Sequence, residues 1–242
     1  MAQRSLTADD VRRATDRFAT GLADADPVAP VPACPGWAVA DLVAHVGNVH
    51  AWAARIVETA EPQQTPDDVP EPGDLEGWYR ERAARLVAAL EAADPDAPCW
   101  NFSGVNPTKG FWPRRQTHET LMHLVDLDQA HGRTVELDAA LSADGVSEVF
   151  EVFGPRMFAR GFRVDLDAPV GLVATDTGDR WALEPDAEGP PRLHDPVTPP
   201  PDRLEGTALQ LWLLLWNRAD EGVTRTGDAD RLARFLASRL TP

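Results

Sequence analysis

The sequence has few of the features that mark secreted or membrane-embedded proteins. It contains only two cysteines, Cys34 and Cys99, which are too few for a disulfide framework. No stretch approaches the roughly 20 apolar residues that a membrane-spanning helix needs. The first residues, MAQRSLTADD, lack the apolar core of a signal peptide. We therefore expect a cytoplasmic protein that has free thiols and no membrane partner.

Basic residues are also scarce. The chain has 23 Lys and Arg residues, of which Lys109 is the only lysine, against 39 Asp and Glu residues. The resulting formal charge of −16 repels the phosphate backbone of nucleic acid, so we expect no nucleic-acid partner. A hydrophobic content of 43% is typical of a folded globular protein. A length of 242 residues allows one large or two small domains.

Apolar residues at helical spacing predict several long helices in the first two thirds of the chain. Thr7 and Asp10 form the pattern of a capping box ahead of the first helix. The predicted helical ranges are about 8–22, 39–56, 74–93, 113–131 and 146–157, the last with a kink near Gly154-Pro155. No convincing strand precedes residue 162. We therefore expect an up-and-down four-helix bundle with a connecting fifth helix over residues 1–162.

The pattern changes after Gly161. The β-rich runs VGLVAT and RWALE flank the turn residues 176–179 and predict a hairpin. Thr207 and Gln210 form a second capping-box pattern ahead of the apolar helix ALQLWLLLWNRA, and a short final helix follows near residues 232–240. The expected fold class is thus mainly α, with a small α/β C-terminal domain over residues 163–242.

The helix near residues 113–131 carries a pair of potential metal ligands. Glu119 and His123 are four residues apart, so their side chains project from one helical face on adjacent turns. Asp126 follows on the same face, where a carboxylate could orient a ligating histidine. The alternative for Glu119 is an ordinary ion pair on the helix surface with Arg115, which is also four residues away.

His45 is the candidate third ligand. It lies at the edge of the apolar stripe of the second helix, and neighbouring helices of a bundle can bring inward-facing residues to one point. Two histidines and one carboxylate that leave an open position are typical of catalytic zinc, although nickel, cobalt and iron accept the same donors. The remaining histidines, His50, His118, His131 and His194, are predicted to lie at the surface or behind the ligands.

Two motifs together resemble a known family. CPGWAVADLVAHVG combined with FWPRRQTHETLMHLVDLDQA is similar to the mycothiol-dependent maleylpyruvate isomerase family, within the DinB-like metalloenzyme superfamily. The segment LEGTALQLWLLLWNRA also matches that pattern, so the resemblance extends over nearly the whole chain. It implies a DinB-like bundle with His45, Glu119 and His123 as ligands of a divalent metal. It also implies mycothiol as a low-molecular-weight thiol cosubstrate.

The resemblance further implies the chemistry. The metal would hold the thiol as a nucleophilic thiolate, which adds to a small electrophile that carries a carboxylate. Arg218 matches an arginine expected to hold that carboxylate, and an interdomain salt bridge is the alternative for it. Two positions depart from the family pattern: Leu124 replaces an arginine, and Asn217 replaces a glycine before Arg218. Trp37 and Trp112 could line the pocket or belong to the core.

Three functions are compatible with these observations. The first is a mycothiol-dependent isomerase or thiol S-transferase. The second is a zinc-dependent hydrolase that uses metal-activated water in place of the thiol. The third is a non-catalytic metal-binding or regulatory relative that keeps the fold. Dependence of turnover on an added thiol separates the first function from the second.

Overall fold

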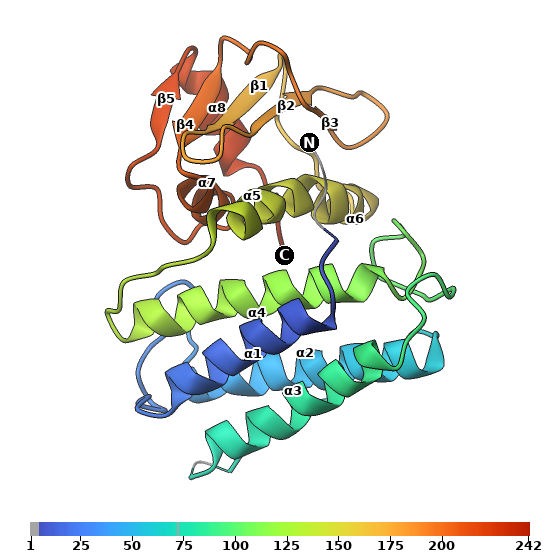
Figure 1. Cartoon of the computed structure of the whole chain (residues 1–242). Coiled ribbons are helices and arrows are strands. Elements are labelled where there is room, and N and C mark those ends of the chain that lie inside the picture. The colour runs from blue at the N-terminus through green and yellow to red at the C-terminus, as the bar shows by residue number, and fades with distance from the viewer. Residues whose placement is uncertain (1–4, 72) are drawn as a thin grey trace. The chain divides into compact units, whose positions relative to one another are not determined.

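The computed structural model describes residues 5–71 and 73–242, and the chain divides into two units (Figure 1). Ser5–Asn101 and Asn106–Glu136 form a helical unit, whereas Phe102–Val105 belongs with Leu137–Pro242 to a unit that contains a sheet. The predicted class, mainly α with a small α/β C-terminal domain, is confirmed. The sequence predicts a boundary after residue 162. The two units divide near residue 136, because the helices after residue 137 pack with the sheet unit.

Four helices pack together in the first unit: α1 (Ala8–Leu22), α2 (Val39–Thr59), α3 (Leu75–Glu91) and α4 (Phe111–Ala130). The side chains that the 3.6-residue period predicts to be buried form the core, and Val11, Phe18 and Leu42 are fully buried. Asp10 accepts a hydrogen bond from the backbone N–H of Thr7, so the predicted capping pattern of α1 is present.

The helix directions differ from the strict alternation expected of an up-and-down bundle. Trp78 packs on Gly47 and Arg85 pairs with Glu58 at 2.7 Å, so α2 and α3 run in the same direction (Figure 1). The connection between them has to return along the helices. Asp68, midway along it, is held there because its carbonyl oxygen accepts from Asn48 and its carboxylate accepts from Arg82.

The second unit begins with an irregular helical run. It consists of α5 (Ala139–Glu148), the π-helical turn η1 (Val149–Phe153) and α6 (Gly154–Ala159). Pro155 has no backbone N–H with which to continue the α-helical pattern, and the wider turn lies immediately before it. The irregularity expected near Gly154-Pro155 therefore takes the form of a π-turn.

The sheet has the strand order β3-β2-β1-β4-β5. Its strands are β1 (Val170–Ala174), β2 (Arg180–Glu184), β3 (Arg192–His194), β4 (Arg203–Gly206) and β5 (Thr224–Thr226). β1 and β2 form the predicted antiparallel hairpin, and β4 runs parallel to β1.

α7 (Ala208–Leu215) packs on α5 and begins at the predicted capping box of Thr207 and Gln210. α8 (Ala229–Ala237) is the last helix. β3, β4 and β5, which are only three or four residues long, are not predicted from the sequence.

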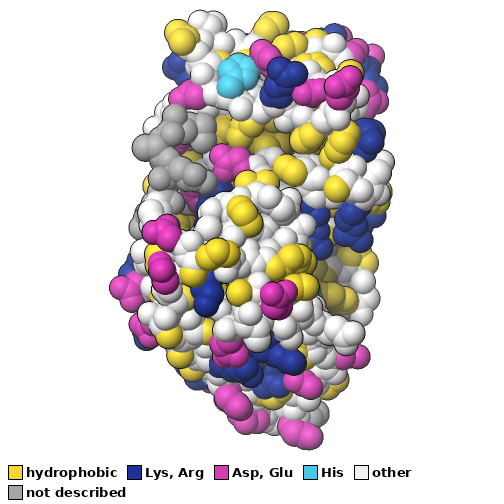
Figure 2. Space-filling model, turned by 90° about the vertical axis from the view of Figure 1, so that its right-hand side faces the viewer, with side chains coloured by type: hydrophobic (Ala, Val, Ile, Leu, Met, Phe, Trp, Pro, Cys, Tyr) yellow, Lys and Arg dark blue, Asp and Glu magenta, His cyan; other side chains and the backbone are white. Residues whose placement is uncertain are grey.

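No helix in the part of the chain that the structure describes is both long and apolar enough to cross a lipid bilayer. Acidic and basic side chains are interspersed over the face drawn in Figure 2. The excess of acidic residues in the sequence therefore does not gather into one acidic patch on that face.

A tight contact between α5 and α7 provides a test of the fold. A Cβ atom added at Gly145 would lie 2.4 Å from the ring of Trp212, which is fully buried. We expect Gly145→Ala to lower the free energy of unfolding, because the overlap costs about 1–3 kcal/mol and exceeds the roughly 1 kcal/mol that alanine gains in a helix. Chemical denaturation would measure the change.

Gly154→Ala is the matched control, because its added Cβ would meet only the side chain of Pro190 at 3.8 Å. Gly154 is helical and precedes Pro155, whose ring disfavours this conformation for a residue with a Cβ, so the control should lower the unfolding free energy by less than Gly145→Ala. Equal effects of the two substitutions would contradict the close packing of α5 on α7.

Candidate metal centre

A tight turn before α2 prepares one side of the site. Gly36 has a φ of 87°, a conformation that glycine adopts without strain. The N–H of Trp37 donates to Cys34 O at 3.0 Å, and Trp37 O accepts from the N–H of Val31 at 2.9 Å. The turn thereby places the half-buried Trp37 ring against the ring of His45, with 5.0 Å between the ring centroids.

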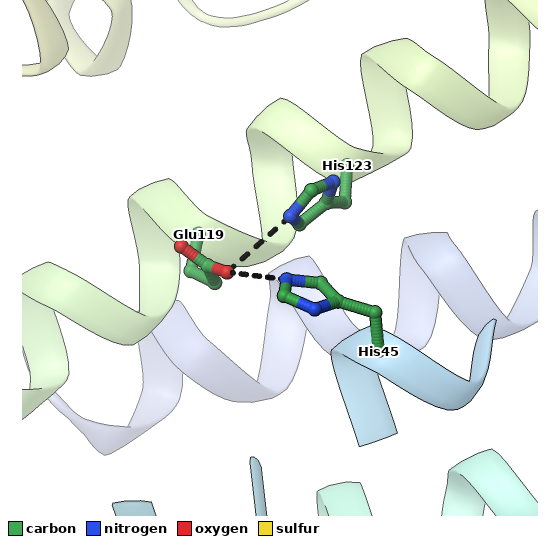
Figure 3. A group of neighbouring side chains, drawn as sticks. All are labelled: His45, Glu119 and His123. Atoms are coloured by element: carbon green, nitrogen blue, oxygen red, sulfur yellow. Dashed lines mark ion pairs between the residues drawn. The ribbon is translucent and has the colours of Figure 1, made fainter. Parts of the chain in front are cut away.

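The three predicted ligands lie together (Figure 3). His45 projects from α2, and Glu119 and His123 project from adjacent turns of α4. Glu119 Oε1 lies 3.4 Å from His45 Nε2 and 3.3 Å from His123 Nε2. The side chain of His45 is 37% exposed, whereas those of Glu119 and His123 are 16% and 11% exposed, so the site is reached from the side of His45.

These donor atoms fit a divalent metal. Two imidazole nitrogens and one carboxylate oxygen lie within 4.8 Å of one another. Ligands about 2.0–2.2 Å from a tetrahedral zinc ion are separated by about 3.3–3.6 Å, and the two measured distances to Glu119 fall at this spacing. We therefore keep His45, Glu119 and His123 as the predicted ligands. Three protein ligands would leave the fourth position of a tetrahedral metal open to a further group.

Arg115 occupies the other side of the Glu119 carboxylate. Its Nη2 donates to Glu119 Oε2 at 2.7 Å, and only 3% of its side chain is exposed. The ion pair between Arg115 and Glu119 that the sequence suggests therefore exists, but it is buried rather than on the surface. Because it uses Oε2, it is compatible with a metal ligand at Oε1.

Asp126 supports His123 from behind. Its Oδ2 lies 2.8 Å from His123 Nδ1, and its side chain is completely buried. A carboxylate only accepts hydrogen bonds, so Nδ1 carries the proton and Nε2 is the nitrogen directed toward Glu119. This orientation is the one that a metal ligand requires.

The protonation equilibria reflect this close packing. Burial alone raises the pKa of Glu119, but hydrogen bonds from His123 and His45 and the charge of Arg115 outweigh it and hold this pKa well below its usual value. Burial alone lowers the pKa of His123, but Asp126 and Glu119 raise it to about 9. A divalent cation at Nε2 takes the place of the proton that His123 otherwise holds there.

Two further residues lie close to the site: Cys34, which was not predicted there from the sequence, and His50, which was predicted to lie at the surface or behind the ligands. Cys34 Sγ lies 3.8 Å from Asp126 Oδ2, so the turn before α2 also contacts the group that orients His123. His50 is fully buried, and its Nε2 lies 3.0 Å from Thr120 Oγ1. Thr120 donates its own proton to the Gln116 carbonyl, so it must accept from His50 Nε2–H. Burial lowers the pKa of His50 to about 3 and keeps the ring neutral.

The structure places other predicted residues as follows. Trp112 is fully buried and stacks edge-on with Trp52 and Phe111, which is a core position. His118 is also fully buried and is therefore not a surface residue. In the sheet unit, Arg218 Nη1 donates to Trp216 O at 2.8 Å. Asn217 before it has a φ of 54°, a conformation that asparagine tolerates better than most residues and that glycine adopts freely.

Comparison with known proteins identifies the family. A model of the mycothiol maleylpyruvate isomerase N-terminal domain family matches residues 8–128, half of the chain, and this range includes all three candidate ligands. The chain belongs to this family. An uncharacterized protein found in two strains of Mycobacterium tuberculosis is 31% identical over 159 residues, which cover 62% of this chain and 81% of that protein.

The fold of the family extends through the sheet unit. Crystal structures of the mycothiol-dependent maleylpyruvate isomerase, and of its variant with one histidine replaced by alanine, match with a TM-score of 0.65. Each match covers 90% of both chains at 16% sequence identity. At this identity the likeness shows a shared fold.

We expect the purified protein to bind about one divalent metal ion per chain, because three ligands converge on one point. His45→Ala or Glu119→Ala should remove most of the metal, as measured by elemental analysis of dialysed protein. His131→Ala, at the end of α4, is the control and should keep the metal. Stoichiometric metal in Glu119→Ala would exclude Glu119 as a ligand.

Removal of the Asp126 carboxylate should weaken metal binding without abolishing it. The Asp126→Asn side chain can present an amide to His123 Nδ1 and no longer enforces the Nδ1–H form. We expect a loss of metal affinity of about 10-fold to 100-fold, measured by competition with a chelator. Unchanged affinity would show that α4 alone orients His123.

Proposed function

We propose that this protein is a mycothiol-dependent metalloenzyme, either a cis-trans isomerase or a thiol S-transferase. The predicted ligands of its divalent metal, with zinc as the first choice, are His45, Glu119 and His123. Its cosubstrates would be mycothiol and a small electrophile that carries a carboxylate. The observation that supports this proposal is the convergence of two histidine Nε2 atoms on one oxygen of Glu119, within the range that matches the family.

A divalent metal, when bound, lowers the pKa of a thiol and holds it as a nucleophilic thiolate. The residues of the chain prepare the place for this chemistry. Asp126 keeps the His123 proton on Nδ1, and Arg115 engages the second oxygen of Glu119. Trp37 packs against the His45 ring in a tilted arrangement, with 5.0 Å between the ring centroids.

In the isomerase reaction, the thiolate sulfur forms a bond to one carbon of a cis double bond that is conjugated to a carbonyl group. The electron pair of the double bond moves toward that carbonyl, and the remaining carbon–carbon single bond rotates. Elimination breaks the carbon–sulfur bond and releases the trans isomer together with the unchanged thiolate. In a transferase reaction the carbon–sulfur bond is retained, and the adjacent carbon takes up a proton from solvent, which balances the proton that the thiol released when it became a thiolate. Arg218 is our candidate for binding the substrate carboxylate through its guanidinium group.

Dependence on thiol tests this proposal. Metal-loaded protein would be assayed with and without mycothiol against cis-unsaturated dicarboxylates and epoxides, with product formation followed by mass spectrometry. We expect turnover only with the thiol present, and its loss in Glu119→Ala but not in the control His131→Ala. Turnover that is independent of thiol would favour a hydrolase with metal-activated water. Thiol binding without turnover of any substrate would favour a binding protein.

A further inference from the structure

The two oxygens of the Glu119 carboxylate have different surroundings. Oε1 lies within 3.4 Å of both histidine Nε2 atoms, whereas Oε2 accepts from Arg115 Nη2 at 2.7 Å. Arg115 lies one helical turn before Glu119 on α4, so the backbone of one helix sets the distance between the two groups. With Oε2 engaged, Glu119 offers a metal a single oxygen.

The charge of Arg115 also bears on the site. A guanidinium group stays protonated under all ordinary conditions, and this one is almost completely buried, where charges are poorly screened by water. It offsets the negative charge of Glu119. A divalent cation beside Glu119 would therefore keep more of its positive charge for a further ligand. Such a centre favours an anion over neutral water.

We propose that Arg115 is a positioning residue that makes this centre selective for an anionic ligand such as a thiolate. It acts through Glu119, by holding Oε2 away from the metal and by offsetting the carboxylate charge. The inference rests on the proposed function for the divalent metal at His45, Glu119 and His123 and for naming the thiolate as that anion.

Substitution of Arg115 in cobalt-loaded protein tests this role, because cobalt accepts the same donors as zinc and its visible absorption reports each ligand that binds. Arg115→Met removes the charge and keeps an unbranched side chain. Arg115→Lys keeps the charge. Arg85→Met is the matched control, since it removes an arginine that pairs with Glu58 across the surface of α2 and α3. Azide and 2-mercaptoethanol are the two probes.

We expect Arg115→Met to retain about one cobalt per chain and to bind both probes at least about tenfold more weakly than the unmodified protein. Arg115→Lys should stay within about threefold of the unmodified protein, and Arg85→Met should be unchanged. If Arg115→Met does not fold, Arg115→Gln carries the same expectation, since it also removes the charge. Probe affinities that are unchanged in the uncharged variant would overturn the proposal.

Two further outcomes would also overturn it. Loss of cobalt from Arg115→Met would show that Arg115 is needed to hold the metal rather than to select its ligand. Equal weakening by Arg115→Lys and Arg115→Met would show that the charge is not what matters. The proposed function is tested separately by the unmodified protein, because binding of azide without binding of any thiol would reject the thiol reaction and still leave the role of Arg115 measurable.

Discussion

The carboxylate of Glu119 is the group on which the rest of the site depends. One of its oxygens faces the Nε2 atoms of His45 and His123, and the other faces the guanidinium of Arg115. A buried carboxylate without such partners would be costly, since burial alone raises its pKa. The same contacts that make the charged group tolerable also orient it. Stability and the preparation of a metal centre therefore come from one set of interactions.

The bundle topology makes this arrangement possible. α2 runs antiparallel to α4, as the pairing of His45 with His123 and of Trp52 with Trp112 shows, so a residue near the start of α2 meets the second half of α4. The turn at residues 34–37 contacts the site at two places. Trp37 packs against His45, and Cys34 contacts Asp126, the carboxylate that orients His123. One short turn thus contacts His45 directly and His123 through Asp126.

Much of the fold could be predicted from the sequence, because it depends on local patterns. Apolar periodicity predicted the helices of the first unit, and the capping boxes at Thr7 and Thr207 predicted where α1 and α7 begin. Helical geometry also predicted that Glu119, His123 and Asp126 share a face of α4. The short strands β3 to β5 were not predicted, because three or four residues with a strand partner distant in the sequence carry little local pattern.

The sequence by itself determined the identity and helical spacing of the candidate ligands and, through two motifs, the family. Only the tertiary structure decided which oxygen of Glu119 faces the histidines and which faces Arg115, since the two oxygens are chemically identical until neighbours distinguish them. It also decided that α2 and α3 run in the same direction, and that His50 is a neutral, buried neighbour of Thr120. These features arise from contacts between residues far apart in the chain, which periodicity within one helix does not encode.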